Sequence, residues 1–212
     1  MRIDIWSDFA CPFCFIGKKH WDLAVSKFPH RERLDVRWHS FELDPQARNK
    51  GQTVTQMLAQ KYRMTEAKAR QMNEGVAQQG ARVGIAFDFD RVILANTFDA
   101  HRLALWAQEH GRDLREGLFR AYFSEGLDVS DAEVLVRIAV AGTVEEALVR
   151  TFLRSGEYTD RVRADEAQAQ EFGLSGVPAF VIAQKYLVSG AQPPEAMLEA
   201  LNTAWEEQHG KA

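Results

Sequence analysis

The pair Cys11 and Cys14 constrains this sequence more than any other feature, because the 212-residue chain has no further cysteine and these two stand three positions apart. Two cysteines placed at random in such a chain would show this spacing about once in a hundred cases, so the pair requires a mechanistic explanation. A zinc site would need two more ligands, and the six histidines form no close pair. We therefore interpret the cysteines as a redox pair, with two inert buried thiols as the alternative.

The cysteine pair lies between a predicted strand and a predicted helix. Residues 2–6 alternate as in a short strand, and residues 14–29 carry apolar side chains at helical spacing. Cys11 then falls at the N-cap and Pro12 at the first helical position, where the missing N–H of proline costs nothing. Positions three apart share one helix face, so the two sulfurs can meet in disulfide geometry. Because a helix start stabilises a thiolate, we expect Cys11 to attack substrates and the better covered Cys14 to resolve the mixed disulfide.

Further strand and helix signals follow in an order typical of one fold. Residues 34–41 predict a second strand, residues 179–182 and 186–188 a hairpin, and residues 193–208 a last helix that opens with two prolines. Because the chain opens with β–α–β, we expect a parallel strand pair with a right-handed crossover. Apolar spacing predicts seven helices in between, at residues 53–61, 65–79, 96–110, 112–124, 131–139, 144–155 and 159–172.

The order β–α–β, helical block, β–β–α predicts an α/β protein with a thioredoxin-like fold and a large all-helical insertion. We expect residues 1–45 and 158–212 to form the two parts of the thioredoxin-like domain, with the helical insertion at residues 46–157.

Composition and charge exclude several classes of function. With 26 basic and 30 acidic residues the formal net charge is -4, so no strong positive field attracts nucleic acid or an anionic membrane. No apolar run approaches the roughly 18 residues that a membrane span needs. Asp4 and Asp8 fall where a signal peptide would be apolar, so we expect a cytoplasmic protein.

The segment DFACPFCFIGK at residues 8–18 resembles the active-site segment of the DsbA-family thioredoxin-fold oxidoreductases. More narrowly it resembles the FrnE-like branch, whose pattern is D-x-x-C-P-[W/F]-C-[Y/F]-[I/V]-G. The resemblance extends over most of the chain, in the blocks FELDP at 41–45, NTFDAHR at 96–102, AYFSEG at 121–126, GVPAFV at 176–181 and SGAQP at 189–193. Some members carry additional C-terminal cysteines; this chain has none, so no second redox centre is expected.

The resemblance implies further active-site residues. It implies a cis peptide bond between Val177 and Pro178, facing the cysteines, with the Val177 backbone free to pair with an extended substrate. Pro12 and Phe13 would support the pair, and Phe13 adds bulk but no charge beside Cys11. The segment that holds His101 faces the redox site in the family, so His101 is a candidate substrate-facing residue; local packing is the alternative.

Two further sets of residues are candidates for substrate contact. The first set is four phenylalanines, which either form an apolar rim around Cys11 or belong to the core: Phe9, Phe13, Phe15 and Phe41. Gly190 and Ala191 precede the last helix with Gln192, and N–H groups at such a position can hold an anion such as a glutathione carboxylate.

The function that these features favour is a thiol–disulfide oxidoreductase or isomerase of the DsbA family, acting on protein or small-molecule disulfides. We expect no metal and no bound cofactor beyond the redox-active disulfide, and leave glutathione open as a co-substrate. The alternative is a glutathione-dependent transferase or isomerase of the same fold, similar to the kappa-class glutathione transferases and the 2-hydroxychromene-2-carboxylate isomerases. A third hypothesis is a redox-inactive adaptor that binds partners through the helical block. We expect no nucleic acid or membrane partner, and a homodimer stays open.

Overall fold

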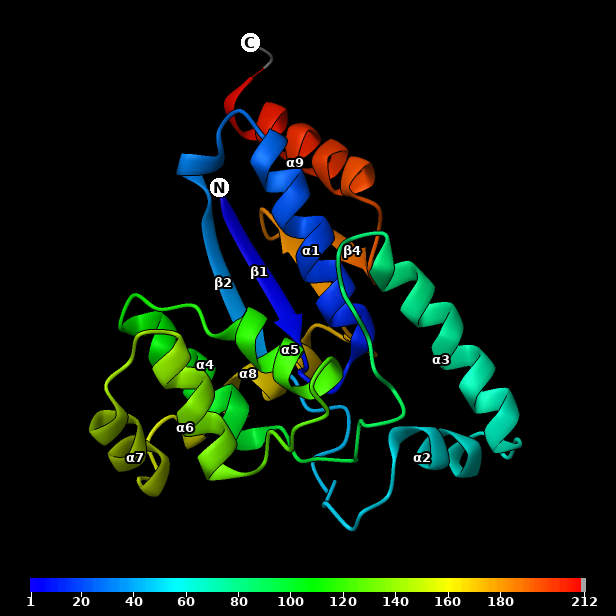
Figure 1. Cartoon of the computed structure of the whole chain (residues 1–212). Helices are drawn as coiled ribbons and strands as arrows, with labels where there is room; N and C mark the ends of the chain where they lie inside the picture. The colour runs from blue at the N-terminus through cyan, green and yellow to red at the C-terminus, as the bar shows by residue number, and fades with distance from the viewer. Residues whose placement is uncertain (211–212) are drawn as a thin grey trace.

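A four-stranded mixed sheet forms the centre of the computed structural model, which describes residues 1–210 (Figure 1). The strand order is β2-β1-β3-β4, with β1 parallel to β2 and β3 antiparallel to both β1 and β4. The predicted fold class, the parallel first strand pair and the antiparallel hairpin are confirmed. The strands are β1 (Arg2–Ser7), β2 (Asp35–Ser40), β3 (Ala179–Ile182) and β4 (Tyr186–Ser189).

Helices α1 (Pro12–Lys27) and α9 (Pro194–His209) pack side by side on one face of the sheet. Successive side chains of a strand point to opposite faces, so alternate residues of β1 face this pair of helices. Ile3 of β1 lies in a buried cluster with Trp21 of α1 and Leu201 of α9. This cluster fixes α1, and with it the cysteine pair at the start of α1, against the sheet.

Helix α8 (Thr159–Glu171) packs against the sheet through the other set of β1 side chains. Trp6 of β1 is fully buried and forms a small cluster with Ala179 of β3 and Ala169 of α8. The sheet is therefore sandwiched between α1 and α9 on one side and α8 on the other.

The remaining helices form the insertion, which shares its core with the first turns of α1. Phe15 of α1 stacks on Phe119 of the insertion with ring centroids 5.1 Å apart. In Figure 1 most of these helices gather around the end of β1 that leads into α1, while one of them runs back beside α1. They are α2 (Val54–Lys61), α3 (Glu66–Ala81), α4 (Phe98–Glu109), α5 (Arg115–Phe123), α6 (Ala132–Ala141) and α7 (Glu146–Arg154), and a short 3₁₀ turn, Arg31–Arg33, precedes β2.

Some helix ends differ from the sequence-based expectation for local reasons. The helix predicted at residues 112–124 begins at Arg115, because the Asp113 carboxylate accepts a hydrogen bond from the Arg115 N–H at 2.9 Å. The expected boundaries of the insertion, at residues 46 and 157, stay a prediction. Within residues 1–210, no helix is both long enough and apolar enough to cross a membrane.

His39 joins α8 to the sheet through two buried carboxylates. Its Nε2 lies 2.8 Å from Oδ1 of Asp4, and its Nδ1 lies 2.7 Å from Oδ1 of Asp165. The second oxygen of Asp165 accepts the Ser40 N–H at 2.9 Å, and its backbone carbonyl accepts the indole N–H of Trp6 at 3.0 Å. Asp4 is also paired with Arg2, at 2.7 and 2.8 Å, so the His39 ring is the group that these two buried carboxylates share.

We expect His39→Ala to lower the free energy of unfolding by about 3 kcal/mol, because it leaves the buried Asp4 and Asp165 carboxylates without their shared partner. Urea denaturation at neutral pH measures the loss. The matched control is Arg37→Ala in the same strand, whose bond to Asp35 lies at the surface and should matter little. Equal effects of the two substitutions would contradict this role of His39.

Candidate active site

The two cysteines occupy the junction between β1 and α1. Cys11 is the N-cap of α1 with extended backbone angles, and Pro12 follows at the first helical position. The N–H of Cys14 donates to the Cys11 carbonyl at 3.0 Å, which closes the first turn. Both cysteines are free thiols, and their side chains lie close enough for Cys11 to affect the pKa of Cys14. The sequence pattern thus gives a dithiol at the start of α1.

Cys11 lies beneath the turn that precedes β3. Its thiol donates to the carbonyl of Val177 at 3.4 Å, and the Val177–Pro178 bond is cis, as the resemblance implied. We expected Cys11 to stand open at the helix end, but its exposed fraction is only 5%. The reason is the Val177 turn, which covers the sulfur and leaves Phe13 as the exposed neighbour, at 40%.

Cys14 lies one turn further into α1 and is fully covered. Its exposed fraction is 1%, and its sulfur accepts the Asp8 N–H at 3.4 Å. Burial raises the pKa of the Cys14 thiol well above its ordinary value, and the adjacent Cys11 side chain raises this pKa further. Cys14 is therefore a thiol at neutral pH, out of reach of substrates and in contact with Cys11.

The buried carboxylate of Asp8 fixes the loop that carries the cysteines. One oxygen accepts the Ala10 N–H at 3.1 Å and the Thr97 hydroxyl at 2.8 Å, and lies 3.3 Å from Nε2 of His101. The other oxygen accepts the Leu43 N–H at 2.7 Å. One side chain thus joins the active-site loop, the segment after β2 and the first turn of α4.

For His101 and most of the phenylalanines the structure agrees with the packing alternative. His101 is buried against Asp8. Phe9 and Phe15 belong to the core shared with the insertion, and Phe41 is half-buried beside Trp6. Phe13 alone of the four is exposed, because the insertion supplies aromatic partners that bury Phe9 and Phe15.

Two of the three amides that were candidates for an anion site before α9 are already hydrogen-bonded. The Gly190 N–H donates to the Pro178 carbonyl at 2.8 Å, and the Gln192 N–H donates to the Gly190 carbonyl at 2.9 Å. Pro193 and Pro194 follow and have no N–H to offer. Gly190 instead supports the turn that covers Cys11, while Ala191 packs against the core cluster that holds both cysteines.

Sequence reasoning missed the role of Gly17, the last residue of the active-site pattern. A Cβ at this position would lie 2.9 Å from Cγ of Pro178. Only glycine therefore lets α1 approach the Pro178 turn this closely. The signal was present, since a glycine inside a helical segment points to a close packing contact.

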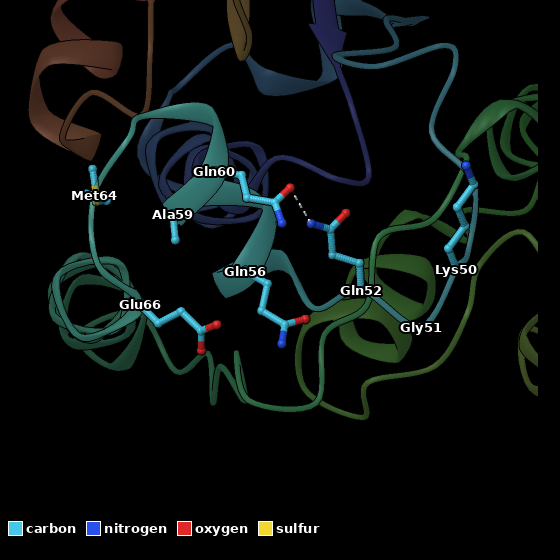
Figure 2. Close-up of a pocket in the computed structure, with 8 residues that line it drawn as sticks. All are labelled: Lys50, Gly51, Gln52, Gln56, Ala59, Gln60, Met64 and Glu66. Carbon is cyan, nitrogen blue, oxygen red and sulfur yellow. Dashed lines mark hydrogen bonds between the residues drawn. The ribbon is translucent and has the colours of Figure 1, made fainter.

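A shallow hollow of about 650 Å³ opens between the segment before α2 and the start of α3 (Figure 2). Figure 2 shows the Gln60 and Gln52 side chains joined by a hydrogen bond of 3.0 Å across part of it. None of the site residues expected from the sequence lines this hollow, and it offers no thiol. Its lining residues are Lys50, Gly51, Gln52, Gln56, Ala59, Gln60, Met64 and Glu66.

The sequence matches the family described as "DSBA-like thioredoxin domain" over residues 2–202, so the chain belongs to the DsbA-like thioredoxin family. The structure is similar to a "probable DsbA oxidoreductase" of Streptomyces coelicolor, with a TM-score of 0.92 and 40% identity, covering 98% of this chain and 91% of that one. The assignment to the FrnE-like branch stays a prediction.

Two more distant structures share the fold. A 2-hydroxychromene-2-carboxylate isomerase gives a TM-score of 0.71 at 14% identity and covers 98% of both chains. The cytosolic disulfide reductase DsbM of Pseudomonas aeruginosa gives 0.64 at 18% identity, covering 98% of this chain and 100% of that one. A structure of that reductase with glutathione also matches.

Because burial keeps Cys14 protonated, we expect the Cys11→Ser variant to resist alkylation by iodoacetamide at pH 7 and the Cys14→Ser variant to react readily. The raised pKa of Cys14 also makes stability depend on pH. The unfolded chain ionises this thiol more readily than the folded protein does, so the free energy of unfolding falls as the pH rises above the ordinary thiol pKa, about 8.5. Rate profiles of the two single-cysteine variants from pH 6 to 10 measure the difference. Equal rates at pH 7 would contradict the assignment of roles.

We expect Gly17→Ala to lower the free energy of unfolding by about 1–3 kcal/mol, because the added methyl group forces α1 and the Pro178 turn apart. Gly75 in α3 is a matched control, since a Cβ there meets nothing within 4 Å. Gly75→Ala should raise stability by about 0.5–1 kcal/mol. Thermal unfolding of both variants distinguishes a packing role of Gly17 from a plain helix-propensity effect.

Proposed function

We propose that this chain catalyses thiol–disulfide exchange, with Cys11 as the attacking thiol and Cys14 as the resolving thiol. The observation that carries the proposal is the pair of contacting free thiols at the start of α1, one beneath the Val177 turn and the other fully buried. Unequal burial separates the two roles, because a substrate that reaches Cys11 cannot reach Cys14.

The reaction proceeds in two exchange steps. The Cys11 thiolate attacks one sulfur of a substrate disulfide, which forms a mixed disulfide and releases the first substrate thiolate. The Cys14 thiol then loses its proton and attacks Sγ of Cys11. A disulfide between Cys11 and Cys14 forms, and the second substrate thiolate leaves. The same steps in reverse oxidise a substrate dithiol.

The Val177 turn favours an extended substrate. Its carbonyl accepts the Cys11 thiol in the free protein, and this bond is given up when Cys11 reacts. The freed backbone can then pair with a strand of substrate lying beside Phe13, the exposed side chain next to the sulfur. Substrates of this kind are unfolded or flexible protein segments and small disulfides.

We propose a cytoplasmic location, which is supported by the similar fold of the reductase DsbM, described as cytosolic. Glutathione and thioredoxin keep cytoplasmic thiols reduced, so the favoured direction there is reduction or isomerisation of substrate disulfides.

A glutathione-dependent isomerase or transferase is the second candidate, and the shared fold with the 2-hydroxychromene-2-carboxylate isomerase favours it. Two observations weigh against it. The paired thiols serve no purpose in such a reaction, and two of the three amides expected to hold a glutathione carboxylate are already hydrogen-bonded.

We expect Cys14→Ser to accumulate mixed disulfides at Cys11, because the resolving thiol is gone while the attacking thiol remains. Incubation with an oxidised model protein, followed by non-reducing electrophoresis and mass spectrometry, detects the adduct. The double variant Cys11→Ser, Cys14→Ser is the control and should trap nothing. A wild-type protein that reduces no disulfide, together with a Cys14→Ser variant that traps none, would refute the proposed function.

A further inference from the structure

Resolution of the mixed disulfide requires a route for the Cys14 proton. Cys14 is 1% exposed, so no bulk water reaches its sulfur directly. The Asp8 N–H donates to this sulfur at 3.4 Å, and the hydroxyl of Ser7, the last residue of β1, is near enough to lower the pKa of the Cys14 thiol. An amide cannot take up a thiol proton, whereas a hydroxyl both donates and accepts. Ser7 is therefore the neighbour of Cys14 that can pass a proton on.

Ser7 also lines a small, partly open cavity of about 20 Å³. Ser40 is its neighbour across the parallel pair of β1 and β2, so both side chains point to the face that carries α1. From the insertion come the ring of His101 and the guanidinium of Arg115, which lies 4.8 Å from the Trp38 ring. The complete lining is Ser7, Phe9, Trp38, His39, Ser40, His101, Ala104, Leu105 and Arg115.

Two polar groups of this lining have unused hydrogen-bonding capacity. Ser40 Oγ and Arg115 Nε are both buried, and neither has a hydrogen-bond partner within residues 1–210, although Arg115 Nε forms an ion pair with Oδ1 of Asp113 at 3.2 Å. Ser40 is 1% exposed and Arg115 8%. Buried polar groups are paired with protein or with ordered water in the great majority of cases. A cavity that holds one water needs about 10–15 Å³ and two to four polar partners, and this cavity meets both conditions.

Building on the proposed function, we propose that this cavity binds one water molecule which, with the Ser7 hydroxyl, carries the proton of the Cys14 thiol away during resolution of the mixed disulfide. The water bonds to Ser40, to Nε of Arg115 and to Ser7. It thereby links the resolving thiol to the imidazole of His101.

His101 is suited to receive the proton. Its Nε2 lies 3.3 Å from the Asp8 carboxylate, which can only accept a hydrogen bond, so Nδ1 is the ring nitrogen that remains to take up a proton. The other titratable or charged groups around the cavity are His39 of β2, which is held by two carboxylates, and Arg115 of α5. Neither of these offers a free acceptor, which leaves His101 as the base.

The step balances in atoms and electrons. The S–H bond of Cys14 breaks, its proton passes to the Ser7 oxygen, the Ser7 proton passes to the water, and a water proton passes to His101. The electron pair left on the Cys14 sulfur forms the bond to Sγ of Cys11. The bond between Cys11 and the substrate sulfur breaks, and the substrate leaves as a thiolate.

The first test fills the cavity without removing any polar group. Ala104→Val adds two methyl groups to the lining and displaces the water, while Ala104→Ser leaves room for it and is the matched control. Rapid-quench experiments with glutathione disulfide give separate rates for mixed-disulfide formation and for its resolution. We expect Ala104→Val to slow resolution about tenfold at pH 7, with formation of the mixed disulfide unchanged. Ala104→Ser should resolve at the wild-type rate.

The pH profile separates a proton route from a merely structural effect. Above the pKa of Cys14 the thiolate forms without help, so the variants should converge with the wild type at high pH. Ser7→Ala should show the same profile, and Ser7→Thr, which keeps the hydroxyl, should restore the rate. A loss that is equal at every pH, or no loss in either variant, would overturn the proposal.

A second readout does not depend on activity. A high-resolution crystal structure of the reduced protein should show a water within hydrogen-bond distance of Ser40 Oγ and Ser7 Oγ, and a dry cavity would overturn the proposal. A wild-type protein that forms no mixed disulfide would instead refute the proposed function. A wild type that resolves normally while the variants match it would refute the proton route alone.

Discussion

The carboxylate of Asp8 is the interaction on which the site depends. It accepts hydrogen bonds from the active-site loop, from Leu43 after β2 and from Thr97 at the start of α4. The active-site loop and Leu43 lie in the thioredoxin-like part, and Thr97 lies in the helical insertion. A single buried carboxylate therefore joins the two parts next to the cysteines. Burying a carboxylate is costly unless its oxygens are well satisfied, and that requirement fixes the positions of all its donors.

The two thiols have different surroundings because they lie one helical turn apart. Cys11 at the N-cap meets the Val177 turn, whereas Cys14 sits among the end of β1 and the core of the insertion. Gly17, one turn further along, lets the helix lie against Pro178. The division between an attacking and a resolving thiol is thus a consequence of helix geometry and of one missing side chain.

The local features of the site were predictable from the sequence, and the long-range ones were not. Alternation in β1 and the Cys11-Pro12 start of α1 depend on neighbouring residues, so the pattern alone placed them correctly. The inward orientation of His101 was not predictable, because its partner Asp8 lies 93 positions away in the sequence. Phe9 and Phe15 are buried by α5, and the Gly190 amide is taken by Pro178. Such pairings depend on the packing of distant segments, which no spacing rule encodes.

The contact between the two sulfurs also bears on how the protein withstands peroxide. A thiolate oxidised by peroxide becomes a sulfenic acid, which proceeds irreversibly to sulfinic and sulfonic acids unless a thiol captures it. Cys14 is in hydrogen-bond contact with Cys11, so a sulfenic acid at Cys11 condenses with it to the disulfide and loses water. The buried thiol therefore protects its partner, and oxidative damage is converted into an ordinary intermediate of the exchange cycle that cellular thiols reverse.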